Sequence, residues 1–203
     1  VTLFPEAVRA YLAASIVGRA RRQGLLDAEA VDPRQWAGGR HRVVDDRPYG
    51  GGPGMVLAAP PIAACVEALQ ARSARTRLLL TSPQGRRLDQ AWAGELATEE
   101  HLVVLCGHYE GIDERIVDLY RPEEFSLGDV VISGGELAAL VLTDAVTRLL
   151  PGALGHAESA AADSFAGEDG LLDHPCYTRP VEFHGLRVPE ALLSGDHARI
   201  EAW

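Results

Sequence analysis

The sequence contains no lysine, and all 19 of its basic residues are arginine. This absence excludes a P-loop, in which a lysine contacts the phosphates, and any mechanism that needs a lysine Schiff base. The net charge of −10 argues against a general nucleic-acid binder, because such proteins carry a basic surface. Arginine is nevertheless the side chain best shaped for phosphate groups and base edges.

The sequence also has few cysteines and no long apolar run. Cys65, Cys106 and Cys176 are scattered without CxxC spacing, which predicts neither a zinc site nor a disulfide framework. We therefore expect reduced thiols and a cytoplasmic protein. No segment reaches the length of a membrane helix, and the N-terminus lacks the pattern of a signal peptide. A chain of 203 residues, 47% of them hydrophobic, suits one packed domain with at most a small appendage.

The most informative segment spans residues 102–136. It opens with an apolar run that predicts a buried strand, which ends at Gly107 in a polar loop. We expect a second short strand over residues 130–132, followed by the sequence SGGE and a helix. An earlier strand over residues 77–81 leads through the loop SPQG into a helix over residues 88–97. Strand, helix and strand at this spacing predict an α/β fold with parallel βαβ units and a sheet covered on both faces.

Glycine-rich loops follow the predicted strands at one edge of this sheet. The carboxyl ends of parallel strands leave a crevice there, and glycines let the backbone approach a ligand closely. The sequence therefore predicts a pocket for a nucleotide-like ligand, without naming the ligand. The helix that follows is apolar on nearly all sides, so we expect it to be buried in the core or in a subunit interface. Near its end, Asp144 and Arg148 are spaced for a helical ion pair.

Two other segments have distinctive compositions. Residues 48–55 hold several glycines and two prolines, which predicts a shaped loop. It is not a dinucleotide fingerprint, because Met55 stands where the last glycine should fall, and spacing alone favours a structural role. Asp45 and Asp46 are more typical of turn capping than of cation binding. Residues 155–167 are small and polar, which predicts a flexible linker.

Six motifs resemble, in the same order, those of the bacterial TrmD-type tRNA (guanine-N1)-methyltransferases. They are spread over nearly the whole chain, so the resemblance is far more specific than a single glycine motif. They are DDRPYGGGPGM (45–55), SPQGR (82–86), CGHYEGIDER (106–115), SLGDVVISGGEL (126–137), DSFAGEDGLLDHPCYTRP (163–180) and LLSGDHARIEAW (192–203).

The resemblance implies the fold of the SPOUT methyltransferases. This is an α/β fold with a mostly parallel sheet flanked by helices and a deep trefoil knot, plus a small helical C-terminal domain. We accordingly expect a knotted domain that binds S-adenosylmethionine over residues 1–154. The flexible linker over residues 155–167 would connect it to a small helical domain that contacts tRNA over residues 168–203.

The implied reaction transfers a methyl group from S-adenosylmethionine to N1 of the guanosine immediately 3′ of the anticodon in tRNA. The enzyme would be a homodimer whose active site is shared between its subunits. Carried over from the family's motifs, three loops would hold the cofactor, and their residues are Thr81, Ser82, Pro83, Gly107, Tyr109, Glu110, Leu127, Gly128, Asp129, Val130, Val131, Ile132, Gly134 and Gly135.

The chemistry at guanine requires two further groups. N1 carries a proton that a general base must remove, and negative charge then develops on O6. Asp163 matches the family's proposed base and Arg148 its partner at O6; without the resemblance, Asp163 would be read as a helix cap in the linker. The residues expected to contact tRNA are Arg47, Tyr49 and Arg179.

The resemblance makes Mg²⁺ a possible second cofactor, near an acidic residue such as Glu110, although the sequence contains nothing like a dedicated metal cage. One alternative function is a SPOUT methyltransferase acting on another RNA nucleoside, which the DSF and SGGEL motifs disfavour. A second is a non-catalytic nucleotide-binding module, which would have no use for Asp163. His108 departs from the family pattern, because many members carry arginine there.

Overall fold

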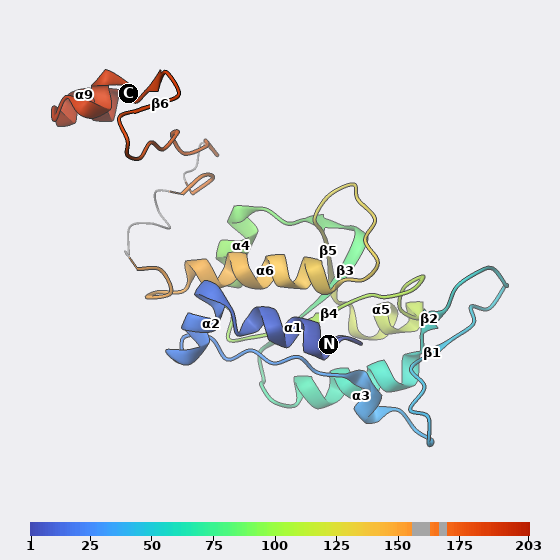
Figure 1. Cartoon of the computed structure of the whole chain (residues 1–203). Helices are drawn as coiled ribbons and strands as arrows, with labels where there is room; N and C mark the ends of the chain where they lie inside the picture. The colour runs from blue at the N-terminus through green and yellow to red at the C-terminus, as the bar shows by residue number, and fades with distance from the viewer. Residues whose placement is uncertain (156–162, 167–169) are drawn as a thin grey trace. The chain divides into compact units, whose positions relative to one another are not determined.

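The computed structural model describes residues 1–155, 163–166 and 170–203 (Figure 1). The chain divides into two compact units, Val1–Ala162 and Asp163–Trp203. Each unit is described by itself. The middle of the predicted linker, residues 156–162, and its last residue lie outside the described residues.

The first unit is built around a three-stranded parallel sheet with the strand order β4–β3–β5. Helix α4 (Gln90–Leu96) connects β3 to β4, and helix α5 (Glu114–Tyr120) connects β4 to β5. These crossovers confirm the predicted α/β class with a parallel sheet flanked by helices. The strands are β3 (Thr76–Arg87), β4 (His101–Leu105) and β5 (Glu123–Ser126).

The two faces of the sheet follow from the alternation of side chains along β3. Leu78 and Leu80 point into one core, and Leu79 between them points into the other. The first core is covered by α3 (Ala59–Gln70), α5 and the short 3₁₀ helix η1 (Pro33–Trp36). The second core is covered by α4 and α6 (Glu136–Leu149). Both faces are therefore apolar and protected from water.

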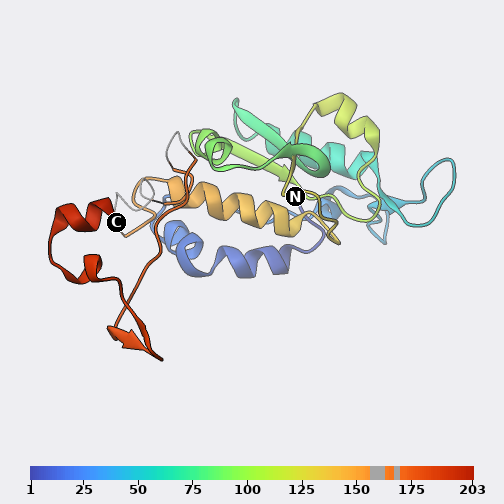
Figure 2. The ribbon, with the colours of Figure 1, turned by 90° about the horizontal axis from the view of Figure 1, so that it is seen from above.

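Two further helices pack along α6 (Figure 2). They are α1 (Pro5–Leu12) and α2 (Ser15–Arg22). Pro5 occupies the first turn of α1, where its missing N–H is not needed. Because α6 packs against the sheet on one side and against α1 and α2 on another, only part of its surface reaches solvent.

Two predictions of local structure are wrong. Residues 130–132 form no strand, and Val131 is 96% exposed. The third strand is β5 instead, where only Phe125 signals burial because the other three residues are polar. The predicted loop SPQG is part of β3, which continues past a register shift between Thr81 and Arg86. Hydrophobicity alone could not separate a buried strand from an apolar loop.

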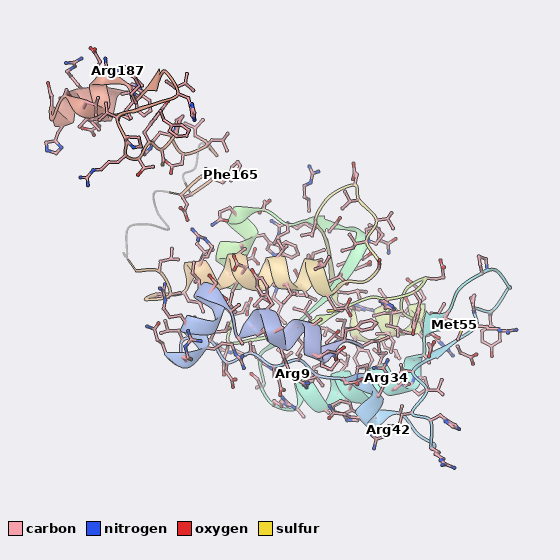
Figure 3. All side chains as sticks on the ribbon, in the orientation of Figure 1. Arg9, Arg34, Arg42, Met55, Phe165 and Arg187 are labelled. Atoms are coloured by element: carbon pink, nitrogen blue, oxygen red, sulfur yellow. The ribbon has the colours of Figure 1, made fainter. Side chains whose placement is uncertain are left out.

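A hairpin follows η1 and projects from the first unit (Figure 3). Strand β1 (Asp45–Asp46) pairs antiparallel with β2 (Val56–Leu57). The loop between them adopts positive φ at four glycines, which explains the glycine content of this segment. The Asp46 carboxylate accepts a hydrogen bond from the backbone N–H of Arg47, as expected of a turn-capping aspartate.

In its described residues, the second unit contains a small hairpin and two short helices. The hairpin pairs β6 (Glu182–Phe183) with β7 (Leu186–Arg187), and the helices are α8 (Glu190–Leu193) and α9 (His197–Ala202). The Asp196 carboxylate caps α9 by accepting hydrogen bonds from the N–H groups of Ala198 and Arg199.

Candidate functional site

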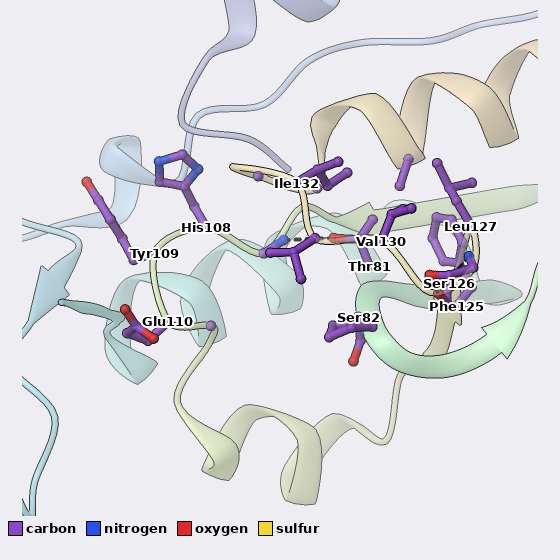
Figure 4. A pocket seen from close by; sticks show the side chains of 18 residues that line it. Thr81, Ser82, His108, Tyr109, Glu110, Phe125, Ser126, Leu127, Val130 and Ile132 are labelled. Carbon is purple, nitrogen blue, oxygen red and sulfur yellow. Dashed lines mark hydrogen bonds between the residues drawn. The ribbon is translucent and has the colours of Figure 1, made fainter. Parts of the chain in front are cut away.

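Three loops meet at the carboxyl edge of the parallel sheet and enclose a cavity of about 210 Å³ (Figure 4). The first is the stretch of β3 at its register shift after Thr81, the second follows β4, and the third follows β5. This is the crevice in which α/β sheets bind ligands. The lining residues are Thr81, Ser82, Pro83, Gly107, His108, Tyr109, Glu110, Gly111, Phe125, Ser126, Leu127, Gly128, Val130, Val131, Ile132, Gly134, Gly135 and Ala138.

The structure brings together every predicted cofactor-binding residue except Asp129, which does not line the cavity. The sequence-based selection missed His108, Gly111, Phe125, Ser126 and Ala138. His108 and Gly111 lie in the motif CGHYEGIDER, and Ser126 is the first residue of SLGDVVISGGEL, so the family motifs could have indicated these three. Phe125 and Ala138 lie outside the motifs. Their place at the pocket depends on the register of β5 and on where α6 begins.

A short hydrogen-bond network fixes the first two loops to each other. The Thr81 hydroxyl accepts from the N–H of Gly107 at 2.9 Å and donates to the carbonyl of Leu105 at 3.3 Å. The N–H of Gly135 donates to the carbonyl of Gly107 at 2.7 Å, so the third loop joins the same network. Backbone groups and one hydroxyl therefore hold the three pocket loops together.

The third loop supplies the apolar wall of the pocket. The Ser126 hydroxyl accepts from the N–H of Gly128 and donates to its carbonyl, and Gly128 has φ of +133°, a conformation that favours glycine. Beyond this turn, Val130 and Ile132 line the cavity while remaining 59% and 40% exposed. Exposed apolar side chains around a pocket suit the flat face of an aromatic ligand.

The second loop contributes the polar side. Glu110 places a carboxylate at the pocket, and Tyr109 has a φ of +59° that is unusual outside glycine. The His108 ring packs edge-on against Phe4 at 5.1 Å and Tyr109 at 4.5 Å between ring centroids. Its Nδ1 atom is buried without a hydrogen-bond partner among the described residues. In this structure the histidine is therefore held by aromatic packing.

The remaining predicted residues lie outside this cavity. Arg148 is in the last turn of α6, and the predicted pair with Asp144 stays a prediction. The Asp144 carboxylate accepts a hydrogen bond from the Tyr11 hydroxyl at 3.0 Å; burial, followed by this bond, raises the pKa of Tyr11. Asp163 is the first residue of the second unit. Arg179 also belongs to the second unit, and its side chain is exposed.

The loop between β1 and β2 carries the other two predicted RNA contacts. Tyr49 is fully exposed, and Arg47 is exposed beside it. Across the described ranges, no three histidine, cysteine or acidic side chains cluster closely enough to hold a metal ion. No helix in the described part of the chain is long and apolar enough to span a membrane.

The fold and the cavity define an α/β protein with a pocket at the carboxyl edge of a parallel sheet. The family model "tRNA (Guanine-1)-methyltransferase TrmD" matches residues 1–203. The chain belongs to this family, as its motifs predict.

Individual relatives agree with the family match. The chain is 54% identical to a tRNA (guanine-N(1)-)-methyltransferase of Anaeromyxobacter sp. (strain Fw109-5), covering 100% of this chain and 82% of that protein. It is 52% identical to the enzyme of the same name from Proteus mirabilis, covering 100% and 81%. The crystal structure of tRNA (m1G37) methyltransferase from Aquifex aeolicus matches with a TM-score of 0.81 and 38% identity, covering 100% of this chain and 84% of that one.

Proposed function

We propose that this protein transfers a methyl group from S-adenosylmethionine to N1 of the guanosine immediately 3′ of the anticodon in tRNA. The observation that carries the proposal is the pocket, whose lining includes all but one of the cofactor residues expected from the family motifs. Family membership and the relatives' names support the same reaction.

The residues of the pocket fit S-adenosylmethionine. Val130 and Ile132 would cover the adenine face, and the glycine backbone around Gly107 and Gly134 would bind its polar edge. The Glu110 carboxylate complements a molecule that carries positive charge. Bound there, the cofactor supplies an electrophilic methyl group on a sulfonium.

The chain itself would supply the groups that act on guanine. Asp163 is proposed to remove the N1 proton as general base, which contributes roughly 10²–10⁴-fold to such reactions. Arg148 is proposed to donate hydrogen bonds to O6, where negative charge develops. A preorganised donor of this kind is worth roughly 10²–10³-fold.

The outer surface of α6 supports a homodimer. Leu137 and Val141 are 62% and 47% exposed, although the opposite side of the helix is buried in the second core. At 3.6 residues per turn, Asp144 and Arg148 lie on the same stripe as these apolar residues. A second copy of the chain covering this stripe would reach Arg148, which is how one active site would be shared between subunits.

The tRNA would contact Arg47 and Tyr49 on the hairpin and Arg179 in the second unit, with the arginines binding phosphate groups. Glu110 is the pocket carboxylate best placed for a Mg²⁺ requirement, which stays a prediction. The trefoil knot likewise stays a prediction from the family. An enzyme with this substrate would act in the cytoplasm.

The test uses tRNA transcripts that carry either guanosine or adenosine immediately 3′ of the anticodon. The protein is incubated with each transcript and S-adenosylmethionine labelled in the methyl group, and incorporation is measured. We expect labelling of the guanosine transcript alone. Equal labelling of both transcripts would overturn the specificity, and no labelling of either would overturn the proposed reaction.

A further inference from the structure

The hairpin that carries Arg47 and Tyr49 is built onto the loop that follows β4. Three backbone hydrogen bonds join the two segments: Glu110 N–H to Met55 carbonyl at 3.0 Å, Leu57 N–H to Gly111 carbonyl at 2.9 Å, and Asp113 N–H to Leu57 carbonyl at 3.0 Å. Leu57 and Ile112 form a parallel bridge in the same ladder. The second pocket loop is therefore also the base of the hairpin.

Gly54 brings a side chain into this junction. A Cβ atom at Gly54 would lie 2.4 Å from Oε1 of Glu110 and 2.6 Å from its Cγ. The glycine therefore leaves the space that the Glu110 side chain occupies. Glu110 also lines the pocket, and Figure 4 shows it on the side of the pocket next to the hairpin. One carboxylate thus touches both the ligand cavity and the loop that projects toward solvent.

The other glycines of the loop have no comparable contact. Gly50, Gly51 and Gly52 all have positive φ, but a Cβ atom at any of them meets nothing within 4 Å. Their role is conformational, since L residues rarely adopt this backbone geometry. Gly54 combines the same backbone requirement, with φ of +87°, and a close approach to a pocket residue. This difference separates Gly54 from its neighbours.

We propose that Gly54 is a positioning residue that couples the methyl-donor pocket to the RNA-facing hairpin through Glu110. A ligand that holds the Glu110 carboxylate fixes the side chain against which Gly54 packs, and the three backbone bonds extend the constraint to Met55 and Leu57. RNA that immobilises the hairpin acts on the same junction from the other side. Because both ligands order the same junction, we expect positive coupling, and since coupling is reciprocal each ligand should raise the affinity for the other by the same factor. The inference rests on the proposed function, because it takes S-adenosylmethionine and tRNA as the two ligands.

The first measurement is the dissociation constant of S-adenosylmethionine, by calorimetry or equilibrium dialysis, with and without saturating tRNA that carries adenosine 3′ of the anticodon, so that the cofactor is not consumed. For the unmodified chain we expect tRNA to tighten cofactor binding by about 5-fold or more, the lower end of typical coupling. Gly54→Ala displaces the Glu110 side chain and should bring this ratio close to one. Gly51→Ala imposes a similar backbone strain, with φ of +82° and open space around it, and should keep the ratio.

A double substitution tests whether Glu110 transmits the effect. Glu110→Ala removes the three atoms that a Cβ at Gly54 would meet. In that background, Gly54→Ala should therefore change the coupling ratio no more than Gly51→Ala does. If Gly54→Ala fails to fold, the coupling ratio of Glu110→Ala alone tests the role of the junction. Glu110→Ala should weaken cofactor binding at the pocket. In addition, the ratio of its dissociation constants without and with tRNA should fall toward one.

The outcomes separate this inference from the proposed function. A chain that methylates tRNA but shows no coupling, or whose Gly54→Ala and Gly51→Ala variants lose coupling equally, overturns the role of Gly54. A chain that does not methylate tRNA overturns the proposed function, whatever the coupling ratio. Selective loss of coupling in Gly54→Ala, with no further change when Gly54→Ala is added to Glu110→Ala, supports the inference.

Discussion

Gly135 approaches Thr81 so closely that a Cβ atom added to the glycine would lie 1.8 Å from the Thr81 hydroxyl oxygen. The same atom would lie 2.9 Å from the backbone nitrogen of Gly107. Gly135 has a φ of −74° that any residue can adopt, so the requirement for glycine here is one of space. Three pocket loops meet at this point, and no side chain fits between them.

The first prediction concerns Gly135→Ala. The added methyl must push Thr81 away from Gly107 and break the bond that joins the first two loops. Overpacking of this kind costs about 1–3 kcal/mol of unfolding free energy. We also expect a loss of S-adenosylmethionine affinity, and denaturant unfolding and calorimetry measure the two effects.

Gly94→Ala is the matched control, because Gly94 lies in α4 and a Cβ there meets nothing within 4 Å. It should leave cofactor affinity unchanged and stabilise the fold by about 0.4–1 kcal/mol. Equal cofactor affinity in both variants would show that the approach of Gly135 to Thr81 does not shape the pocket.

The second prediction separates the proposed chemistry from cofactor binding. Asp163→Ala should lower the single-turnover rate of tRNA methylation by about 10²–10⁴-fold, and Arg148→Ala by about 10²–10³-fold. Neither residue lines the cavity, so S-adenosylmethionine affinity should stay within a small factor of the original. Rapid-quench kinetics and calorimetry measure the two quantities.

Arg75→Ala provides the control for lost charge, since Arg75 is exposed at the surface of the first unit. It should keep the methylation rate. If Asp163→Ala or Arg148→Ala instead weakened cofactor binding and kept the methylation rate at saturating cofactor, the two residues would have to be reassigned from chemistry to binding.

The third prediction addresses the second copy of the chain. Leu137→Glu places a charge on the exposed stripe of α6 and should convert a homodimer into monomers, since burying an unpaired charge is strongly unfavourable. Sedimentation equilibrium measures the change in mass. Leu119→Glu is the control, because Leu119 is 71% exposed on α5, away from this stripe. If both variants became monomers, or if both stayed dimeric, the subunit interface would not be the exposed stripe of α6.

The sequence predicted most of the sheet because side-chain alternation along β3 is a local property. Leu78, Leu79 and Leu80 face alternate cores, and a short apolar run of this kind predicts a strand that is buried on both faces. Strand β5 escaped prediction because it contains a single buried aromatic residue, Phe125, between polar ones. The apolar residues 130–132 suggested a strand, yet they line a pocket instead.

The lining of the cavity follows the family motifs closely, whereas its connection to the hairpin could not be predicted. Family motifs selected the loop residues one by one, and the strand ends brought them together. The pairing of Leu57 with Gly111 and Asp113 depends on backbone hydrogen bonds between segments that are far apart in the chain. No side-chain pattern encodes such bonds, so Gly54 looked like an ordinary loop glycine.

The last prediction concerns the contribution of Arg77, the second residue of β3, to stability and to its pH dependence. The Arg77 guanidinium binds Glu95 at 2.7 Å, Glu99 at 3.0 Å and Glu123 at 2.7 Å. It thus connects β3 to α4, to the segment that follows α4, and to β5. Its side chain is only 16% exposed. Arg77→Ala removes the shared partner of three carboxylates. We expect it to lower the free energy of unfolding by about 1.5–3 kcal/mol, as hydrogen bonds to charged groups contribute. Arg72→Ala breaks the half-exposed pair with Glu29 and should cost about 1 kcal/mol or less.

The pH dependence follows from the Glu123 carboxyl group. Its hydrogen bond from Arg77 is the largest influence and holds the pKa of Glu123 below the ordinary value of 4.5. A lowered pKa in the folded state stabilises the protein above pH 4.5, and this contribution is lost as the pH falls through the folded-state pKa. Glu123→Gln should therefore be less stable than the original chain at neutral pH, and the two stabilities should converge in acid. Urea unfolding at a series of pH values from 7 to 3 measures the difference, and a gap that stayed constant down to pH 3 would contradict the role of this carboxylate.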